Sequence, residues 1–138
     1  MVDYERLLEH RNAVNKYASF MGIVTTEIKE GYARAEMQIR PEHENAVGTV
    51  HGGAIFSLAD TSAGAAAASY GTKMTTVSSD FHYLSPAMGT ERLYGEAKAI
   101  KHGKKMSTLE VEIFSDAHKL IAKGTFTYFN LGVPLFEE

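Results

Sequence analysis

The amino-acid sequence predicts one α+β domain over residues 1–138, in which a long helix packs on an antiparallel sheet. Two patterns carry this prediction. An alanine-rich segment, residues 54–70, is followed by four segments in which apolar and polar residues alternate. Strands that follow one another through short turns pair antiparallel. A chain of 138 residues is an ordinary size for one domain, and two domains would each be too small to bury a core.

The N-terminal part of the chain is expected to form a short surface helix and then a β-hairpin. Residues 3–18 carry apolar side chains at a helical spacing, namely Tyr4, Leu7, Leu8 and Val14. Residues 32–39 alternate with a period of two, and residues 22–29 are their expected partner across a turn at Glu30-Gly31. Pro41 ends this pair because proline has no amide hydrogen to donate to a ladder.

A long helix and four strands follow. The helix is expected to have about 16 residues, because alanine has the highest helix propensity and Gly71 is a natural stop. The four strands are expected at residues 74–84, 91–100, 106–114 and 120–129. Such a small sheet leaves its edges and outer face exposed, and oligomers usually bury such surfaces. We therefore expect a homodimer at least.

The amino-acid composition of the chain argues against several classes of function. The 14 Lys and Arg residues against 17 Asp and Glu argue against nucleic-acid binding, which depends on clustered basic residues. The absence of cysteine excludes disulfides, thiolate metal sites and cysteine nucleophiles, and it favours a cytoplasmic protein. The six histidines are scattered, so neither a metal nor a cofactor is expected. The most apolar stretch, residues 52–70, contains Asp60 and many small residues, which is untypical of a membrane span.

The stretch from Asn45 to Gly53, followed by Asp60, is the part of the sequence that suggests chemistry. Two glycines at the start of a helix let another molecule approach the backbone closely. The unpaired N–H groups there lie at the positive end of the helix dipole and would stabilise a carbonyl oxygen that is becoming negative. Asn45 could donate a second hydrogen bond to this oxygen. Acyl transfer needs such a site.

Each of these features also has a structural interpretation. The two glycines could form a simple turn into the helix, and His51 could be an ordinary loop histidine. Asp60 shares a helical stripe with Ser57, Thr61 and Gly64, which could be a solvated face. Asp60 also lies eight residues after Gly52, about 12 Å along a helix axis. It would therefore meet this oxyanion site only across a subunit interface.

The run from Asn45 to Gly53, with Asp60 and then Tyr83-Leu84-Ser85-Pro86 downstream, resembles the hotdog-fold acyl-CoA thioesterases of the phenylacetic acid degradation family. The resemblance covers residues 22–129. It implies the hotdog fold, an antiparallel sheet wrapped around one central helix. It also implies dimers joined edge to edge at their sheets, which pair into homotetramers, with active sites at the dimer interface.

The resemblance also implies roles for individual residues. The residue matching Asp60 is the catalytic carboxylate and reaches a thioester held by the other subunit, as a base for water or as a nucleophile. Thr76 matches a hydroxyl residue that orients water, and His51 positions the loop. The groups that polarise the thioester carbonyl are the backbone N–H of Gly52 or Gly53 and the side chain of Asn45.

The substrate implied is a medium-chain or aryl acyl-CoA, which would be hydrolysed to the free acid and CoA. The acyl pocket is expected near the helix and the strand that follows it, at Phe56, Phe81 and Tyr83. The CoA phosphates could meet the basic turn formed by Lys101, His102 and Lys104, although that turn could equally be a solvated hairpin tip.

Three other functions remain open. A non-catalytic acyl-CoA-binding protein could have the same fold, but Asp60 argues against this reading. A hotdog dehydratase or hydratase pairs a histidine with a carboxylate, and the chain has both His51 and Asp60. The third is a structural oligomerisation module.

Overall fold

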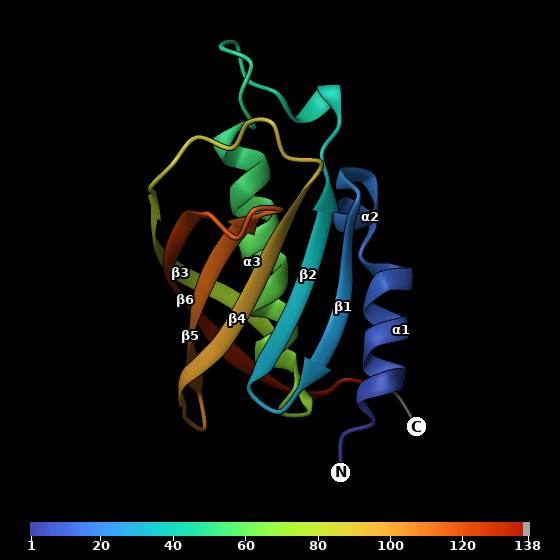
Figure 1. Ribbon diagram of the computed structural model, residues 1–138. Coiled ribbons are helices and arrows are strands. Elements are labelled where there is room, and N and C mark those ends of the chain that lie inside the picture. The colour runs from blue at the N-terminus through green and yellow to red at the C-terminus, as the bar shows by residue number, and fades with distance from the viewer. Residues whose placement is uncertain (137–138) are drawn as a thin grey trace.

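One antiparallel sheet of six strands curves around one long helix in the computed structural model, which describes residues 1–136 (Figure 1). The helices are α1 (Tyr4–Val14), α2 (Lys16–Met21), the 3-10 helix η1 (Pro41–His43) and α3 (Gly52–Ala68). The strands are β1 (Ile23–Lys29), β2 (Tyr32–Gln38), β3 (Thr72–Tyr83), β4 (Arg92–His102), β5 (Met106–Ser115) and β6 (Leu120–Pro134). The predicted α+β fold with a hotdog arrangement is confirmed.

The sheet has the order β1-β2-β4-β5-β6-β3, and every neighbouring pair is antiparallel. The predicted hairpin of β1 and β2 is confirmed, and its turn contains Gly31 at a φ of +69°. A left-handed backbone of this kind is readily adopted only by glycine. Gly71, at a φ of +106°, ends the helical stretch after α3 in the same way.

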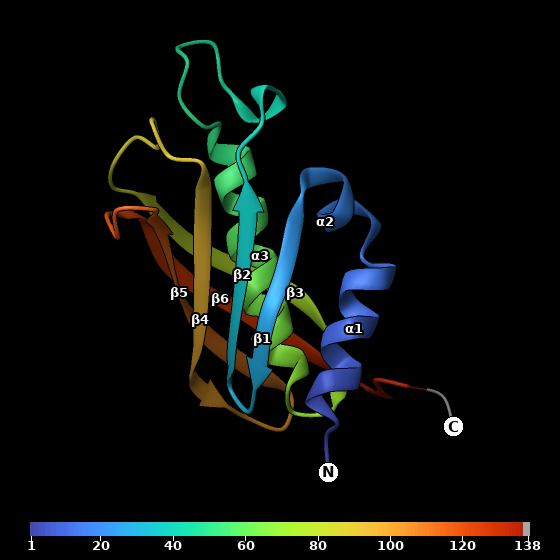
Figure 2. The ribbon, with the colours of Figure 1, turned by 45° about the vertical axis from the view of Figure 1, so that its right-hand side comes forward.

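The predicted single N-terminal helix over residues 3–18 is two helices. Asn15 ends α1 and caps α2, because its side-chain oxygen accepts a hydrogen bond of 3.1 Å from the N–H of Ala18. Asparagine competes for backbone donors in this way and so favours a break over a continuous helix. Figures 1 and 2 show α1 standing beside β1, with α2 lying near the start of that strand.

Small side chains let α3 approach the sheet closely. The five residues Ala63, Ala65, Ala66, Ala67 and Ala68 are all buried. Gly95, on β4, lies directly against the hydroxyl of Ser62, and a side chain at this position would collide with it. The hydrophobic core therefore lies between α3 and the concave face of the sheet.

Strand β3 forms an edge of the sheet and pairs only with β6. Most of its 12 residues are exposed, including the large apolar side chains of Val77 and Tyr83. A long exposed edge strand presents unpaired backbone groups that favour pairing with another chain. Within residues 1–136, no helix is long and apolar enough to cross a membrane.

Candidate active site

The first turn of α3 presents one open backbone donor. His51 caps the helix, and its Nδ1 accepts a hydrogen bond of 2.8 Å from the N–H of Gly53. The N–H groups of Ala54 and Ile55 donate to the carbonyl of His51 at 2.9 and 3.2 Å. The N–H of Gly52 makes no hydrogen bond with any residue that the structure describes. This donor therefore lies free at the positive end of the helix dipole.

Asn45 holds together the loop that precedes the helix. Its Oδ1 accepts hydrogen bonds from the N–H groups of Val47 and Thr49, at 3.0 and 3.1 Å, and its Nδ2 donates to the hydroxyl of Thr49 at 2.8 Å. An amide nitrogen carries two hydrogens, so one of them is left for a further acceptor. Asn45 can therefore position the loop and donate to a substrate oxygen as well.

Tyr83 explains why a glycine begins the helix. Its hydroxyl donates a hydrogen bond of 2.9 Å to the carbonyl of Gly52, and its ring lies 3.3 Å from where a Cβ on residue 52 would be. Any side chain at this position would press on the ring. Gly52, Asn45 and Tyr83 together line a cavity of about 280 Å³.

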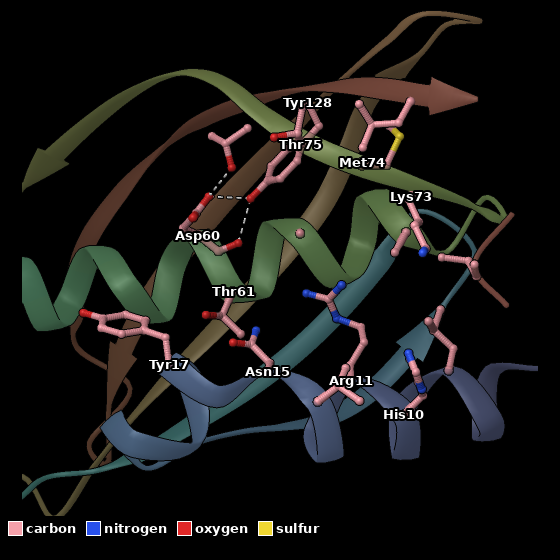
Figure 3. Close-up of a pocket in the computed structure, with 17 residues that line it drawn as sticks. His10, Arg11, Asn15, Tyr17, Asp60, Thr61, Lys73, Met74, Thr75 and Tyr128 are labelled. Atoms are coloured by element: carbon pink, nitrogen blue, oxygen red, sulfur yellow. Dashed lines mark hydrogen bonds between the residues drawn. The ribbon is translucent and has the colours of Figure 1, made fainter. Parts of the chain in front are cut away.

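Asp60 lies two turns further along α3, in a second cluster of polar groups (Figure 3). Its Oδ1 accepts a hydrogen bond of 3.0 Å from the hydroxyl of Thr76 and another from the hydroxyl of Tyr128. The Tyr128 hydroxyl also lies 2.7 Å from the backbone carbonyl oxygen of Asp60, so one proton serves two acceptors. The structure thus brings the hydroxyl of Thr76 to the carboxylate of Asp60.

Tyr128 is a site residue that the sequence analysis missed. The register of the sheet places Tyr128 of β6 directly opposite Thr76 of β3. Burial raises the pKa of the Tyr128 hydroxyl, and the nearby charge of Asp60 and the hydrogen bond to it raise this pKa further. Tyr128 therefore stays protonated and acts as a donor to the carboxylate. The sequence could have pointed to Tyr128 only if the pairing of β3 with β6 had been predicted, because that pairing places Tyr128 opposite Thr76.

Asp60, Thr76 and Tyr128 line a cavity of about 480 Å³ between α1, α3 and β3 (Figure 3). Its apolar wall comes from Leu7, Val14, Ala68, Met74, Leu131 and Leu135. The helical stripe beside Asp60 is therefore not a simple solvated face. Gly64, one turn further along, is buried, and the hydroxyl of Tyr17 lies 2.9 Å from that of Ser57.

The two cavities share no lining residue. Gly52 and Asp60 are separated by eight residues of one straight helix, which corresponds to about 12 Å. Within one protomer, the free N–H and the carboxylate therefore belong to different cavities.

Phe56, Phe81 and Tyr83, the predicted acyl-pocket residues, form an aromatic cluster with Phe126. The ring centroids of Phe56 and Phe81 are 5.7 Å apart, and those of Phe81 and Tyr83 are 5.2 Å apart. Phe56 and Phe81 line neither of the two cavities, and Tyr83 lines only the one at Gly52. The structure does not bring these three rings to Asp60.

Lys101, His102 and Lys104 lie on the hairpin between β4 and β5, at the opposite end of α3 from Gly52 (Figure 1). The ring of His102 stacks on that of Tyr70, with centroids 3.6 Å apart, and its Nδ1 lies 2.7 Å from the hydroxyl of Ser107. None of these three residues lines either cavity.

Among residues 1–136, no group of three or more His, Asp or Glu side chains could hold a metal ion. The site itself offers a carboxylate with two hydroxyl donors, and a backbone N–H with a neighbouring amide. A carboxylate can take a proton from water, and N–H donors can stabilise a developing oxyanion.

Comparison with known proteins gives a consistent result. The family model described as the thioesterase superfamily matches residues 47–122, which include Gly52, Asp60 and Thr76. A protein of Archaeoglobus fulgidus, whose name gives it as a candidate esterase, is 36% identical over 132 residues, covering 94% of this chain and 86% of that protein. Human acyl-coenzyme A thioesterase 13 is 34% identical over 100 residues, covering 70% of this chain and 71% of that enzyme.

Solved structures agree with these sequence matches. The structure of the Escherichia coli PaaI protein, from the phenylacetic acid degradation operon, superposes with a TM-score of 0.84 at 25% identity. The superposition covers 96% of this chain and 99% of that one. The likeness therefore extends over the helix α3 and the whole sheet.

Proposed function

The chain belongs to the thioesterase superfamily and is a thioester hydrolase, and from this premise we propose that its substrate is an acyl-coenzyme A. Two similar proteins, human acyl-coenzyme A thioesterase 13 and Escherichia coli PaaI, are named as enzymes acting on this class of substrate. The products would be the free acid and coenzyme A. The observation that carries the proposal is a half-buried carboxylate, Asp60, combined with a free N–H at Gly52.

The thioester carbonyl oxygen binds at the start of α3. It accepts hydrogen bonds from the N–H of Gly52 and from the second Nδ2 hydrogen of Asn45. Both donors are held in place before the substrate arrives, by the His51 cap and by the loop bonds of Asn45. Donors that are already fixed in position stabilise the transition state, in which the oxygen becomes negative, more than they stabilise the bound thioester.

The carboxylate comes from the neighbouring subunit. Asp60 and Gly52 of one protomer border different cavities, so a complete site needs a second copy of the chain. The exposed edge strand β3 supports such pairing, because two copies can join their sheets there. Asp60 then faces the partner's Gly52 across the interface, and two equivalent sites form in each dimer.

Asp60 acts as a general base. Two donors occupy its Oδ1, which leaves Oδ2 to take one proton from a water molecule. The water oxygen bonds to the carbonyl carbon, the bond from that carbon to sulfur breaks, and the thiolate takes the proton back from Asp60. General-base catalysis of this kind contributes roughly 10²–10⁴-fold to a rate.

The acyl group occupies the cavity of about 480 Å³ beside Asp60, whose volume and apolar wall leave room for acyl groups up to a medium-chain or aryl group. The rings of Phe56 and Phe81 then support the fold behind the site. Lys101, His102 and Lys104 line neither cavity, so a contact of these residues with the CoA phosphates would lie outside the acyl cavity.

The dehydratase alternative finds less support in the geometry. It requires a histidine that can exchange a proton with the substrate, and Nδ1 of His51 is already engaged as the cap of α3, where it accepts the hydrogen bond of the Gly53 N–H. The alternative of a non-catalytic acyl-CoA-binding protein is distinguished from an enzyme by the experiment in the next paragraph.

Thiol release from a panel of short, medium, long and aromatic acyl-CoAs tests the proposal. The chain contains no cysteine, so a thiol reagent detects only the released coenzyme A. We expect rapid release from at least one substrate class. Binding of acyl-CoAs without thiol release from any of them would overturn hydrolysis in favour of a binding protein.

A further inference from the structure

The guanidinium group of Arg11 lies in the Asp60 cavity without a partner. Arg11 belongs to α1, and its side chain extends toward Gly64 of α3 (Figure 3). A terminal nitrogen of Arg11 lies 3.2 Å from where a Cβ on residue 64 would be, so the glycine makes room for the group. Its Nε is shielded from solvent and makes no hydrogen bond, and Arg11 takes part in none of the ion pairs formed by residues 1–136.

A shielded cation without a partner is unfavourable. Burial lowers the pKa of Arg11, and the negative charge of Asp60 and the hydroxyl of Tyr128 compensate only in part. The guanidinium group still keeps its charge, because arginine does not lose its proton in proteins. Charges of this kind are normally paired with an anion that accepts several of their N–H groups. Asp60 acts on Arg11 through its charge, but no carboxylate among residues 1–136 forms a direct ion pair with it.

The charge around the cavity favours an anionic occupant. Arg11, Lys73 and His10 are the basic residues that line it, and Asp60 is the only acidic one. A cavity lined by an excess of one sign attracts ligands of the opposite sign. A planar guanidinium group matches a carboxylate in particular, since it can donate two parallel hydrogen bonds to the two oxygens.

The spacing between Asp60 and Gly64 along α3 indicates how long a ligand must be to reach from Asp60 to Arg11. Gly64 follows Asp60 by one helical turn, about 6 Å along the axis. An extended chain advances roughly 1.2 Å per covalent bond, so four or five bonds span this distance. A thioester carbon next to Asp60 would thus have a carboxylate at the fourth carbon beyond it within reach of Arg11.

We propose that Arg11 binds a carboxylate at the far end of the acyl group, so that the preferred substrates are short acyl-CoAs with a terminal carboxylate. This inference rests on the proposed function, because it takes an acyl-CoA as the ligand, and it names the substrate class of the same site. Arg11 lies outside the segment 47–122 that the family model matches.

Paired substrates test the proposal. Glutaryl-CoA and pentanoyl-CoA have acyl chains of equal length, and only the first ends in a carboxylate. We expect the wild type to show a kcat/KM at least about tenfold higher for glutaryl-CoA, because a charge-assisted pair discriminates strongly in a shielded site. Arg11→Met should lower kcat/KM for glutaryl-CoA at least about tenfold more than kcat/KM for pentanoyl-CoA, because any effect of Arg11 on the charge of Asp60 is common to both substrates.

Arg6→Met is the matched control. Arg6 lies on the same helix, but it packs 4.0 Å over the ring of Phe136 and does not line the Asp60 cavity. We expect it to leave the ratio of the two substrates unchanged. An equal loss on both substrates in Arg11→Met would overturn the proposal, since that result means that Arg11 pairs with an acidic group of the protein, such as one from a second subunit.

A binding measurement separates this inference from the proposed function. Calorimetric titration of the Asp60→Asn variant, and of Asp60→Asn combined with Arg11→Met, measures affinity for both CoA esters without turnover. Tighter binding of glutaryl-CoA that needs Arg11 supports the inference even if the wild type hydrolyses nothing. Hydrolysis of pentanoyl-CoA with equal affinity for the two esters overturns the inference and leaves the proposed function intact.

Discussion

The hydroxyl of Thr76 donates a hydrogen bond of 3.0 Å to Oδ1 of Asp60. The two residues are 16 positions apart in the chain, on β3 and α3, and Tyr128 of β6 donates to the same oxygen. Two donors on one carboxylate oxygen fix the plane of the group and leave its other oxygen free. The proposed catalytic base is therefore oriented by the sheet, while its backbone belongs to the helix.

Replacing Asp60 by Asn should lower kcat by at least about 10²-fold with nearly unchanged KM, because the amide keeps the shape of the carboxylate but cannot accept a proton. Steady-state kinetics on the best acyl-CoA measure this effect. The control is Asp116→Asn, in which one of the two oxygens that accept hydrogen bonds from Thr90, Glu91 and Tyr94 is replaced by an amide nitrogen, and which should reduce thermal stability without a comparable fall in kcat. Full activity of Asp60→Asn would exclude Asp60 from the mechanism.

A matched pair of substitutions tests the role of Thr76. Thr76→Ser keeps the hydroxyl that Asp60 accepts from, whereas Thr76→Val keeps the shape and removes it. We expect Thr76→Val to lower kcat by about tenfold with little change in KM, and Thr76→Ser to retain most of the activity, because an orienting hydrogen bond contributes about 1–2 kcal/mol. Equal activity of the two variants would show that Thr76 does not position the carboxylate.

Mixing two inactive variants tests whether the site spans two subunits. Asp60→Asn removes the base, and Gly52→Val is designed to crowd the start of α3, because a Cβ on residue 52 would lie only 3.3 Å from the Tyr83 ring. In a mixed dimer, one of the two sites would have both Asp60 and Gly52 intact. Random exchange of subunits should therefore restore about a quarter of wild-type activity.

The mixing experiment also has an outcome that would contradict a site shared between two subunits. If each protomer held a complete site, the mixture would be as inactive as either variant alone, however long subunits are exchanged. Size-exclusion chromatography with light scattering provides the control, because both variants must form the same oligomer as the wild type before they are mixed.

Tyr32 makes folding stability depend on pH in the alkaline range. Its hydroxyl donates a hydrogen bond of 3.0 Å to Glu96, and burial together with this bond raises its pKa from 10.0 to about 12. A tyrosine with a raised pKa stabilises the fold while it is protonated. Its contribution is therefore complete below pH 10 and is lost as the pH rises through 12.

Urea unfolding of wild type and Tyr32→Phe at several pH values measures this contribution. We expect the wild type to be more stable at pH 8 by about 1 kcal/mol, a modest value because the pair is partly exposed to solvent. The difference should shrink between pH 10 and pH 12. A difference that stays constant over this window would mean that Tyr32 does not titrate in the folded protein with a raised pKa.

Local sequence patterns were sufficient to predict most of the fold. The alternation in β2 and the alanine-rich composition of α3 are properties of neighbouring residues, so both elements were identified within a few positions. The break between α1 and α2 was missed, because the side chain of Asn15 caps a new helix within a segment that reads as continuously helical. Capping is decided by one hydrogen bond and leaves no periodic signal.

The sequence by itself determined the family and the candidate groups, because the loop from Asn45 to Gly53 and the helix carrying Asp60 form one contiguous stretch whose spacing depends only on helix geometry. Only the tertiary structure decided what surrounds Asp60. Tyr128 reaches it through the pairing of β6 with β3, and Arg11 because α1 packs beside β1 and the Arg11 side chain extends to Gly64 of α3. Strand register and helix packing bring together residues that are distant in the chain, and they are set by burial of the whole core rather than by neighbouring residues.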